Sequence, residues 1–400
     1  MKSANILQAA SDRALAAAKA QFATLEAVSY ENTKRVLDAF RANRVGEAHF
    51  AGTNGYGYND LGRDTLDKIY AEVFGSEAAL VRVQFVNGTH AIACALYGCL
   101  APGDVIVSLT GKPYDTLEAV INGAHGSLRS YGIEYSENPE DVKRAKAVYI
   151  QRSRGYSSRG ALSIADIERL IGEARAVNPD VAAIVDNCYG EFTECREPCH
   201  AGADIIAGSL IKNPGGGIAP CGGYIAGRAD LVERAAERLT VPGLGSEVGA
   251  SLASNRALYQ GLYMAPHCVC EALKTSVYVA ALFAELGFAV SPGCDELRTD
   301  IIQTIELGAP ERVLAFCRGL QSGLPVDSFV TPLPWDMPGY GEPVIMAAGG
   351  FVQGASLELS ADAPMKPPYR VYLQGGVTFE AGRIGIEAAA RELLAQIPRD

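Results

Sequence analysis

The amino-acid sequence predicts an α/β protein with a large, mostly parallel sheet and a smaller α+β C-terminal domain. Three observations support this class. The first residues have a helical pattern, the middle of the chain alternates short apolar runs with amphipathic segments, and a Pro/Gly-rich section lies near the C-terminus. We expect an N-terminal helical arm over residues 1–50, a large α/β domain over residues 51–265 and the smaller domain over residues 266–400.

The elements follow in order along the chain. Residues 1–45 are rich in Ala, Leu, Glu and Lys with apolar residues at helical spacing, which predicts one or two helices. A strand-like segment, "FVN", precedes a helix that opens at Gly88. Short apolar runs then predict buried strands, and amphipathic segments predict helices between them, an alternation typical of βαβ units. The strands are expected at 105–109, 146–150, 181–185, 203–208 and 223–227, and the helices at 115–121 and 165–177.

The last part of the chain predicts a mixed domain. Residues 270–288 have a helical pattern, and residues 299–307 are typical of a strand. The final segment "GRIGIEAAARELLAQI" predicts a strand followed by a closing helix.

Composition excludes several classes of partner. The formal net charge of −11 repels nucleic-acid phosphates and anionic lipid headgroups. The most apolar run, "AIACALYGCL", has about half the length that a bilayer span requires. The N-terminal residues lack the continuous apolar core of a signal peptide. We therefore expect a cytoplasmic protein with no nucleic-acid or membrane partner.

The ten cysteines are unevenly spaced, which indicates reduced thiols and not a disulfide framework. Two groups with histidine would make a zinc site only if folding joined them, and neither has Cys-x-x-Cys spacing. These groups are Cys195, Cys199 and His200, and His267, Cys268 and Cys270. The sequence therefore predicts no metal site, although a metal-binding protein without catalysis remains an alternative.

Three features point to one kind of ligand. In open parallel sheets, ligands bind where the strands end. Asp186 and Lys212 follow two successive predicted strands, and Gly88 with Thr89 opens a helix, whose N-terminus suits a phosphate. A carboxylate keeps a pyridine nitrogen protonated, and a buried lysine can bond covalently to an aldehyde. Together these features match the needs of pyridoxal phosphate.

Long motifs around these residues carry a family resemblance. They are "VDNCYGEF…GADIIAGSLIKNPGGGIAPCGGYIAG", "GYGYNDLGRDTLDKIYAEVFG", "NGTHAIACAL", "GKPYDTLEAVI" and "PPYRVYLQGGVTFE". The chain resembles the fold-type I pyridoxal-phosphate enzymes, and among them the family of aluminium resistance proteins and methionine γ-lyase-like enzymes. The resemblance implies the aspartate aminotransferase fold and a large domain that binds pyridoxal phosphate.

The resemblance also implies roles for individual residues. Lys212 is similar to the Schiff-base lysine, and Asp186 to the partner of the pyridine nitrogen. Ser209 resembles the serine that binds the cofactor phosphate, with Gly88 and Thr89 as further donors. Tyr114 falls where related lyases keep a tyrosine that stacks on the cofactor ring and acts as an acid or base near the leaving group.

The resemblance further implies residues that bind the cofactor phosphate from a neighbouring subunit and a residue that binds the substrate. In related enzymes a tyrosine and an arginine of a neighbouring subunit complete the phosphate site, for which Tyr56 or Tyr58 and Arg63 are the candidates here. This implies a homo-oligomer, a homotetramer built from dimers with shared active sites. Arg383 resembles the arginine that binds the carboxylate of the amino-acid substrate, and three other arginines are alternatives: Arg370, Arg154 and Arg159.

The implied activity is elimination of a γ- or β-substituent, a thiol or a halide, from an amino acid that takes the place of Lys212 on the cofactor. The same residues serve other pyridoxal-phosphate reactions. The alternatives are therefore γ-replacement, racemisation and transamination, besides the metal-binding protein without catalysis.

Overall fold

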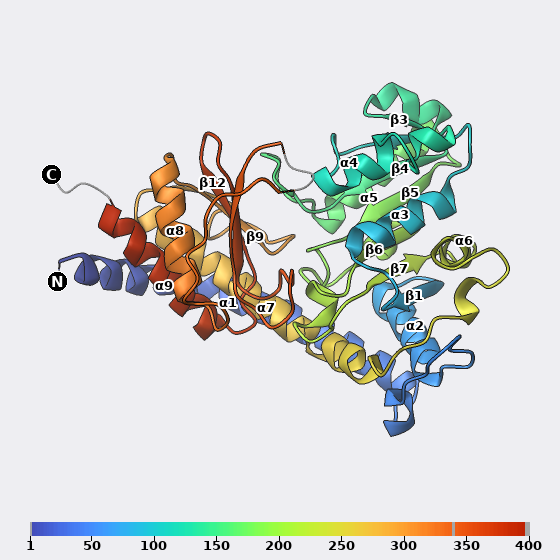
Figure 1. Ribbon diagram of the computed structural model, residues 1–400, viewed down its shortest axis with the longest axis horizontal. Coiled ribbons are helices and arrows are strands. Elements are labelled where there is room, and N and C mark those ends of the chain that lie inside the picture. The colour runs from blue at the N-terminus through green and yellow to red at the C-terminus, as the bar shows by residue number, and fades with distance from the viewer. Residues whose placement is uncertain (1, 338–340, 397–400) are drawn as a thin grey trace. The chain divides into compact units, whose positions relative to one another are not determined.

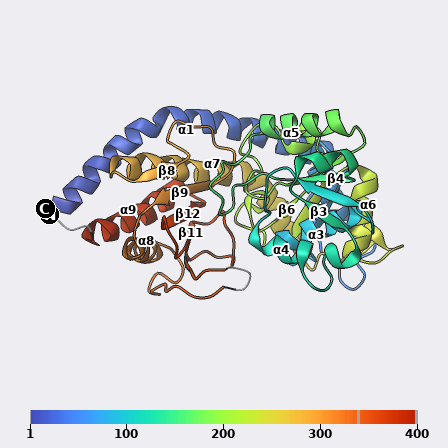
Figure 2. The same ribbon diagram turned by 90° about the horizontal axis from the view of Figure 1, so that it is seen from above.

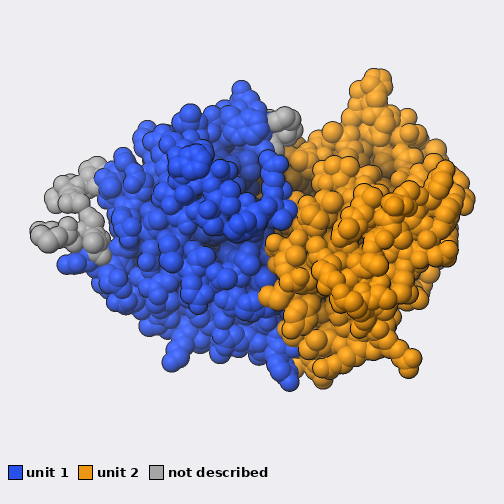
Figure 3. Space-filling view, turned by 60° about the horizontal axis from the view of Figure 1, so that its bottom comes forward, with its two compact units in different colours: residues 1–30, 266–400 blue, residues 31–265 orange. Residues whose placement is uncertain are grey.

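The computed structural model describes residues 2–337 and 341–396 (Figure 1). Residues 338–340, which belong to the segment "MPGYGEP", and the terminal residues 397–400 lie outside the described part. The chain divides into two compact units, residues 1–30 with 266–400 and residues 31–265 (Figure 3). The expected N-terminal helices are a single helix, α1 (Lys2–Ala42), followed by a short 3-10 turn, η1 (Glu47–Phe50).

The unit of residues 31–265 contains a seven-stranded sheet in the order β1-β7-β6-β5-β4-β2-β3. Neighbouring strands from β6 through β5, β4 and β2 to β3 run parallel, whereas β7 is antiparallel to both β6 and β1. The predicted mostly parallel sheet is therefore confirmed. The strands are β1 (Ala78–Arg82), β2 (Val105–Ser108), β3 (Glu134–Ser136), β4 (Ala147–Gln151), β5 (Ala182–Asp186), β6 (Ile205–Ser209) and β7 (Gly223–Gly227).

Helices cover both faces of this sheet (Figure 2). One face packs on α3, α4 and α6 in an apolar core that includes Ile92, Ile121, Ile184 and Val232. The helix α5 lies on the opposite face, so that in Figure 2 the strands are between α5 and the pair α3 and α4. The helices of the unit are α2 (Leu61–Phe74), α3 (Gly88–Cys99), α4 (Asp115–Asn122), α5 (Ile164–Val177) and α6 (Ala229–Leu239).

The unit of residues 1–30 and 266–400 contains an antiparallel sheet in the order β10-β11-β12-β9-β8. Two helices that pack on each other, α8 (Pro310–Ser322) and α9 (Phe379–Gln396), contribute to its apolar core. The predicted smaller α+β part is thus confirmed. Its strands are β8 (Ala289–Ser291), β9 (Ile302–Glu306), β10 (Val344–Ala348), β11 (Ser360–Pro364) and β12 (Arg370–Gln374).

The predicted strand at the start of "GRIGIEAAARELLAQI" is wrong, because its described residues lie entirely within α9. The alternation of Gly, Arg and Ile suggested a strand, but the buried positions follow helical spacing: Gly382, Gly385, Ile386, Ala389, Ala390 and Leu393. A Cβ atom on Gly382 would lie 2.3 Å from Thr275 Oγ1, and one on Gly385 would lie 2.6 Å from Leu359 Cδ2. The glycines are therefore sites of close packing and do not signal a strand.

The strand-like interpretation of "FVN" is also wrong. The nearest strand is β1, which ends at Arg82, and residues 83–87 connect it to α3. Asn87 is the N-cap of α3, and its side chain accepts a hydrogen bond from the backbone N–H of His90 at 2.9 Å. Asn87 itself has an extended backbone, as N-cap residues usually do, but residues 83–87 belong to neither of the two sheets.

The helix α7 (Asn255–Glu285) is long and apolar enough to cross a membrane by length and composition. However, 83% of its most apolar 18-residue window is buried inside the chain. It is therefore typical of a core helix.

Candidate active site

A pocket at the carboxyl ends of β4, β5 and β6 collects several of the predicted residues. Asp186 is the last residue of β5, and Lys212 follows the end of β6. Because β5 and β6 are parallel neighbours, both residues lie at the same edge of the sheet. The pocket is lined by Thr89, Ile92, Tyr114, Gln151, Ser153, Gly155, Asp186, Cys188, Tyr189 and Lys212.

The turn after β6 holds Lys212 in place. Its backbone N–H donates to the carbonyl of Ser209 at 3.3 Å, and its carbonyl accepts from the N–H of Gly215 at 3.1 Å. A Cβ atom on Gly215 would lie 1.7 Å from the carbonyl oxygen of Leu210. The glycine after the lysine therefore lets the backbone close tightly, and Nζ lies 4.0 Å from the centre of the Tyr189 ring.

Charge in the pocket is concentrated on Lys212 and Asp186. Burial alone lowers the pKa of Lys212, yet its acidic neighbours outweigh that effect and raise the pKa above its ordinary value. These neighbours are Cys188, Tyr189, Asp186 and Glu191. Burial raises the pKa of Asp186, and the charge of Lys212 opposes that shift. The two buried side chains therefore interact electrostatically within the pocket.

Two groups orient the carboxylate of Asp186. The hydroxyl of Tyr149 donates to Oδ2 at 3.3 Å, and the backbone N–H of Cys188 donates to Oδ1 at 3.1 Å. Tyr149 is itself buried in β4. The position of the carboxylate at the floor of the pocket is therefore set by the sheet and by the turn that follows β5.

The start of α3 meets the end of β6 beside the pocket. A Cβ atom on Gly88 would lie 3.0 Å from Ser209 Cβ and 3.3 Å from Cys188 Sγ, so the two segments approach closely. The first turn of a helix leaves backbone N–H groups without helical partners. Within the described chain, Ser209 Oγ is buried and has no hydrogen-bond partner. An unsatisfied hydroxyl beside a helix N-terminus fits a phosphate.

Tyr114 is held at the pocket by β4. Its backbone N–H donates to Gln151 Oε1 at 2.7 Å, and Gln151 Nε2 donates to the carbonyl of Ser153 at 3.1 Å. The rings of Tyr114 and Tyr156 lie 6.0 Å apart. Gln151 thus links the tyrosine to the loop after β4.

Six residues that line the pocket were not predicted from the sequence: Ile92, Gln151, Ser153, Gly155, Cys188 and Tyr189. The signal for two of them was available, because Cys188 and Tyr189 lie in "DNCYGEF" directly after Asp186. Gln151 directly follows the strand predicted over residues 146–150, and the end of a strand is an expected place for a ligand contact.

Tyr56, Tyr58 and Arg63 are not among the residues that line this pocket. The two tyrosines are on the surface, with 71% and 53% of their area exposed. Arg63 is buried, and its guanidinium donates to the carbonyls of Gly57 at 2.7 Å and Gly249 at 3.0 Å. In this chain Arg63 braces the loop that presents the tyrosines.

The candidate arginines have different surroundings. In one unit, Arg383 donates to Glu387 at 2.7 Å, and Arg370 pairs with Glu306 across β12 and β9. In the other unit, Arg159 donates to the carbonyl of Ser153 at 2.6 Å. Arg154 is buried on the same loop. Recognition of the substrate carboxylate by Arg383, or by one of the alternatives, stays a prediction.

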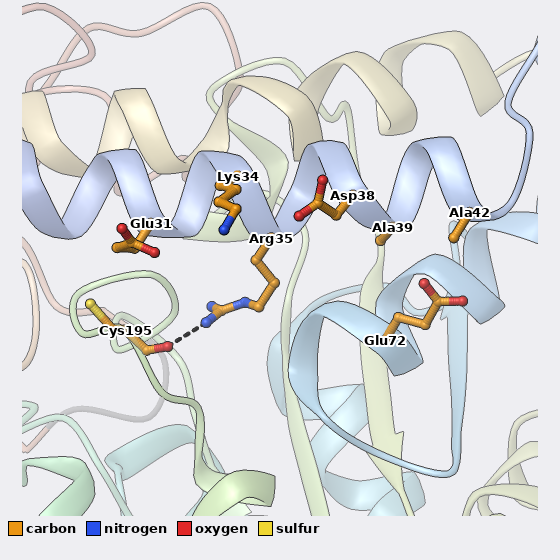
Figure 4. A pocket seen from close by; sticks show the side chains of 8 residues that line it. All are labelled: Glu31, Lys34, Arg35, Asp38, Ala39, Ala42, Glu72 and Cys195. Atoms are coloured by element: carbon orange, nitrogen blue, oxygen red, sulfur yellow. Dashed lines mark hydrogen bonds between the residues drawn. The ribbon is translucent and has the colours of Figure 1, made fainter.

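A second pocket lies between α1, α2 and the loop after β5 (Figure 4). It has a volume of about 500 Å³ and is lined mainly by charged side chains. Arg35 hydrogen-bonds to the carbonyl of Cys195 and lies 3.7 Å from the buried carboxylate of Glu197. Most of the other charged side chains of this groove are exposed to water. The groove therefore lacks buried charged groups comparable to Lys212 and Asp186 in the first pocket. The lining residues are Glu31, Lys34, Arg35, Asp38, Ala39, Ala42, Glu72 and Cys195.

No group of three or more metal-ligating side chains gathers within residues 2–337 and 341–396. All ten cysteines belong to the described residues and are free. The cysteine and histidine groups considered for zinc therefore do not form such a cluster in this part of the chain.

Comparisons with known proteins agree with this geometry. The model of the methionine γ-lyase family matches residues 7–394. An uncharacterised Bacillus subtilis protein, YnbB, is 47% identical over 92% of each chain. A crystal structure of a carbon-sulfur lyase involved in aluminium resistance from Clostridium novyi NT is 46% identical, with a TM-score of 0.92 over 96% of this chain and 95% of that one. The L-methionine γ-lyase of Fusobacterium nucleatum is 28% identical over 60% of this chain and 58% of that protein. The fold-type I architecture is confirmed.

Proposed function

Because this chain belongs to the methionine γ-lyase family, we propose that it is a pyridoxal-phosphate-dependent carbon–sulfur lyase acting on an amino acid. It eliminates a γ- or β-substituent from this amino acid. The expected leaving group is a thiol, and a halide is the alternative. One observation carries the proposal: Lys212 and Asp186 line one pocket, and beside it the unsatisfied hydroxyl of Ser209, at the end of β6, lies close to Gly88 at the start of α3. The carbon-sulfur lyase activity named for the Clostridium novyi protein supports it.

The residues of the pocket fit each part of the cofactor. Lys212 provides the amine that bonds to the aldehyde carbon, and Asp186 provides a carboxylate for the ring nitrogen. Ser209, with the N–H groups of Gly88 and Thr89, provides donors for the phosphate. When bound, pyridoxal phosphate delocalises the electron pair left on the substrate carbon.

The side chains of this chain then move the protons. Once the amino-acid substrate has taken the place of Lys212 on the cofactor, Nζ of Lys212 would take the proton from the substrate Cα. Release from the aldehyde carbon would leave Nζ as a neutral amine, and the acidic neighbours that raise the pKa of Lys212 would stabilise the ammonium that forms when it takes the proton. The hydroxyl of Tyr114, held by Gln151, serves as acid or base near the leaving group.

Product analysis tests the reaction. The holoenzyme is incubated with methionine, cystathionine and amino acids that carry a halide at the β- or γ-carbon. We expect equal amounts of thiol or halide, ammonia and oxo acid, and a four-carbon oxo acid indicates γ-elimination where a three-carbon one indicates β-elimination. Transfer of the amino group to an added oxo acid without release of ammonia would instead support transamination. Stoichiometric zinc without bound cofactor would support the non-catalytic alternative.

Ser209→Ala is expected to weaken binding of pyridoxal phosphate by about tenfold or more, because a hydrogen bond to a charged group contributes about 1.5–3 kcal/mol. Dissociation constants from fluorescence titration measure this change. Pyridoxal, which lacks the phosphate, is the matched control ligand and should bind the wild-type protein and the variant equally. An equal loss for both ligands would contradict a phosphate contact by Ser209.

We also propose that two copies of the chain share their active sites, in a homotetramer built from dimers. The support is a hydrogen-bonded loop with two exposed aromatic rings, Tyr56 and Tyr58. The buried carboxylate of Asp60 accepts from the backbone N–H of Arg63 at 2.9 Å and from Ser251 Oγ at 2.5 Å. This bracing holds Tyr56 and Tyr58 outward, with ring centres 5.8 Å apart. Exposed apolar groups on a fixed loop are typical of an interface.

The double substitution of Tyr56 and Tyr58 by serine tests this assembly. We expect a smaller mass by light scattering, and an affinity for pyridoxal phosphate reduced about tenfold, as for loss of a charged hydrogen bond. Tyr30→Ser, at an exposed tyrosine of α1, is the control and should change neither. An unchanged mass and cofactor affinity in the double variant would exclude a shared site at this loop.

A further inference from the structure

Tyr189 has an unusual position in the pocket. It lies three residues after Asp186, the last residue of β5. Its ring faces Lys212, with Nζ 4.0 Å from the ring centre. Its carbonyl accepts a hydrogen bond from Asn213 Nδ2 at 2.9 Å. The tyrosine therefore contacts both the amine of Lys212 and the residue that follows it.

The backbone of Tyr189 is in the left-handed region, with φ of +71°. This conformation is unfavourable for a bulky side chain and easily adopted by glycine. Strained backbone of this kind concentrates at functional sites. Because a glycine would fit the turn with less strain, the presence of a tyrosine suggests that its ring has a use.

The charges around Lys212 indicate that use. The acidic and titratable groups that face it are Asp186 with its partner Tyr149, Cys188, Tyr189 and Glu191. In the proposed function, Asp186 binds the ring nitrogen of the cofactor, so its charge is no longer available to Lys212 alone. An aromatic face attracts an ammonium group most strongly where water is excluded.

Resting on the proposed function, we infer that Tyr189 is a positioning residue, whose ring holds Nζ of Lys212 while this amine takes the proton from the substrate Cα. In this step the Cα–H bond breaks and an N–H bond forms. The electron pair stays on the substrate carbon, and the amine becomes an ammonium. The ring stabilises that charge and keeps Nζ within reach of the carbon.

Tyr189→Leu in the holoenzyme removes the ring. We expect kcat, and the rate of exchange of the substrate Cα hydrogen with deuterium oxide, to fall about 5- to 30-fold, the range of a buried cation–π contact. KM should change less than about twofold, since the contact is made by the released amine and not by the bound substrate. Tyr189→Phe keeps the ring and is expected to recover most of the lost exchange rate. Tyr263→Leu, at an exposed tyrosine of α7, is the control.

A second variant separates the ring from the backbone strain. Tyr189→Gly also lacks the ring but adopts the positive φ readily, so it is expected to fold and to lose exchange as Tyr189→Leu does. Unchanged exchange in both variants, or an equal loss in Tyr189→Phe and Tyr189→Leu, would overturn the role of the ring.

Trapping by borohydride distinguishes this inference from the proposed function. Reduction of the wild-type holoenzyme is expected to attach the cofactor irreversibly to Lys212, as peptide mass analysis will show. An adduct in the wild-type protein, together with unchanged exchange in the ring-less variants, would overturn the inference alone. Absence of any adduct in the wild-type protein would overturn the proposed function and this inference with it.

Discussion

Lys212→Ala is expected to abolish covalent attachment of pyridoxal phosphate and to lower turnover by at least about 1,000-fold. The substitution removes both the amine that bonds to the aldehyde and the base that takes the Cα proton, and a positioned base alone contributes about 10²–10⁴-fold. Attachment is measured by mass after borohydride reduction, and turnover by release of oxo acid.

Two controls accompany this variant. Lys212→Arg keeps a positive charge beside Asp186 but does not form the same bond to the aldehyde, so it separates loss of charge from loss of the nucleophile. Lys34→Ala, at an exposed lysine of the charged groove, should retain the adduct and the activity. An adduct that persists on another lysine in Lys212→Ala would show that Lys212 is not the anchor.

Asp186→Asn is expected to lower kcat/KM by about 1,000-fold. A carboxylate about 4 Å from a pyridinium nitrogen contributes roughly 4 kcal/mol at an effective dielectric constant near 20. The amide lacks the charge that keeps the ring nitrogen protonated, so the bound cofactor would accept electrons less readily. Steady-state kinetics at saturating pyridoxal phosphate measures the loss separately from weaker cofactor binding.

Asp67→Asn is a matched control for this substitution. Asp67 forms an ion pair with buried Arg82 at 2.8 Å and does not line the pocket. Its substitution should lower Tm, because Arg82 is left without its partner, but leave the kcat of the folded protein unchanged. Comparable losses of kcat in both variants would mean that Asp186 acts through stability and not through the ring nitrogen.

Periodicity predicted the part of the fold that brings the site residues together. Buried strands ending near Gln151, Asp186 and Ser209 were recognisable because short apolar runs alternate with amphipathic helices. The strands β10, β11 and β12 were not predicted individually, since they lie in a region rich in Pro and Gly where the apolar pattern is weak. In α9, glycines that serve close packing were mistaken for a strand signal.

The sequence by itself determined the α/β class, the family and a pocket containing Lys212, Asp186, Thr89 and Tyr114. It could do so because residues after successive parallel strands lie at one edge of the sheet. Only the tertiary structure decided that the Tyr189 ring faces Lys212, and that Arg63 is buried beneath its own loop. The physical reason is that such contacts depend on the backbone angles of turns and on side chains distant in sequence, which local patterns do not specify.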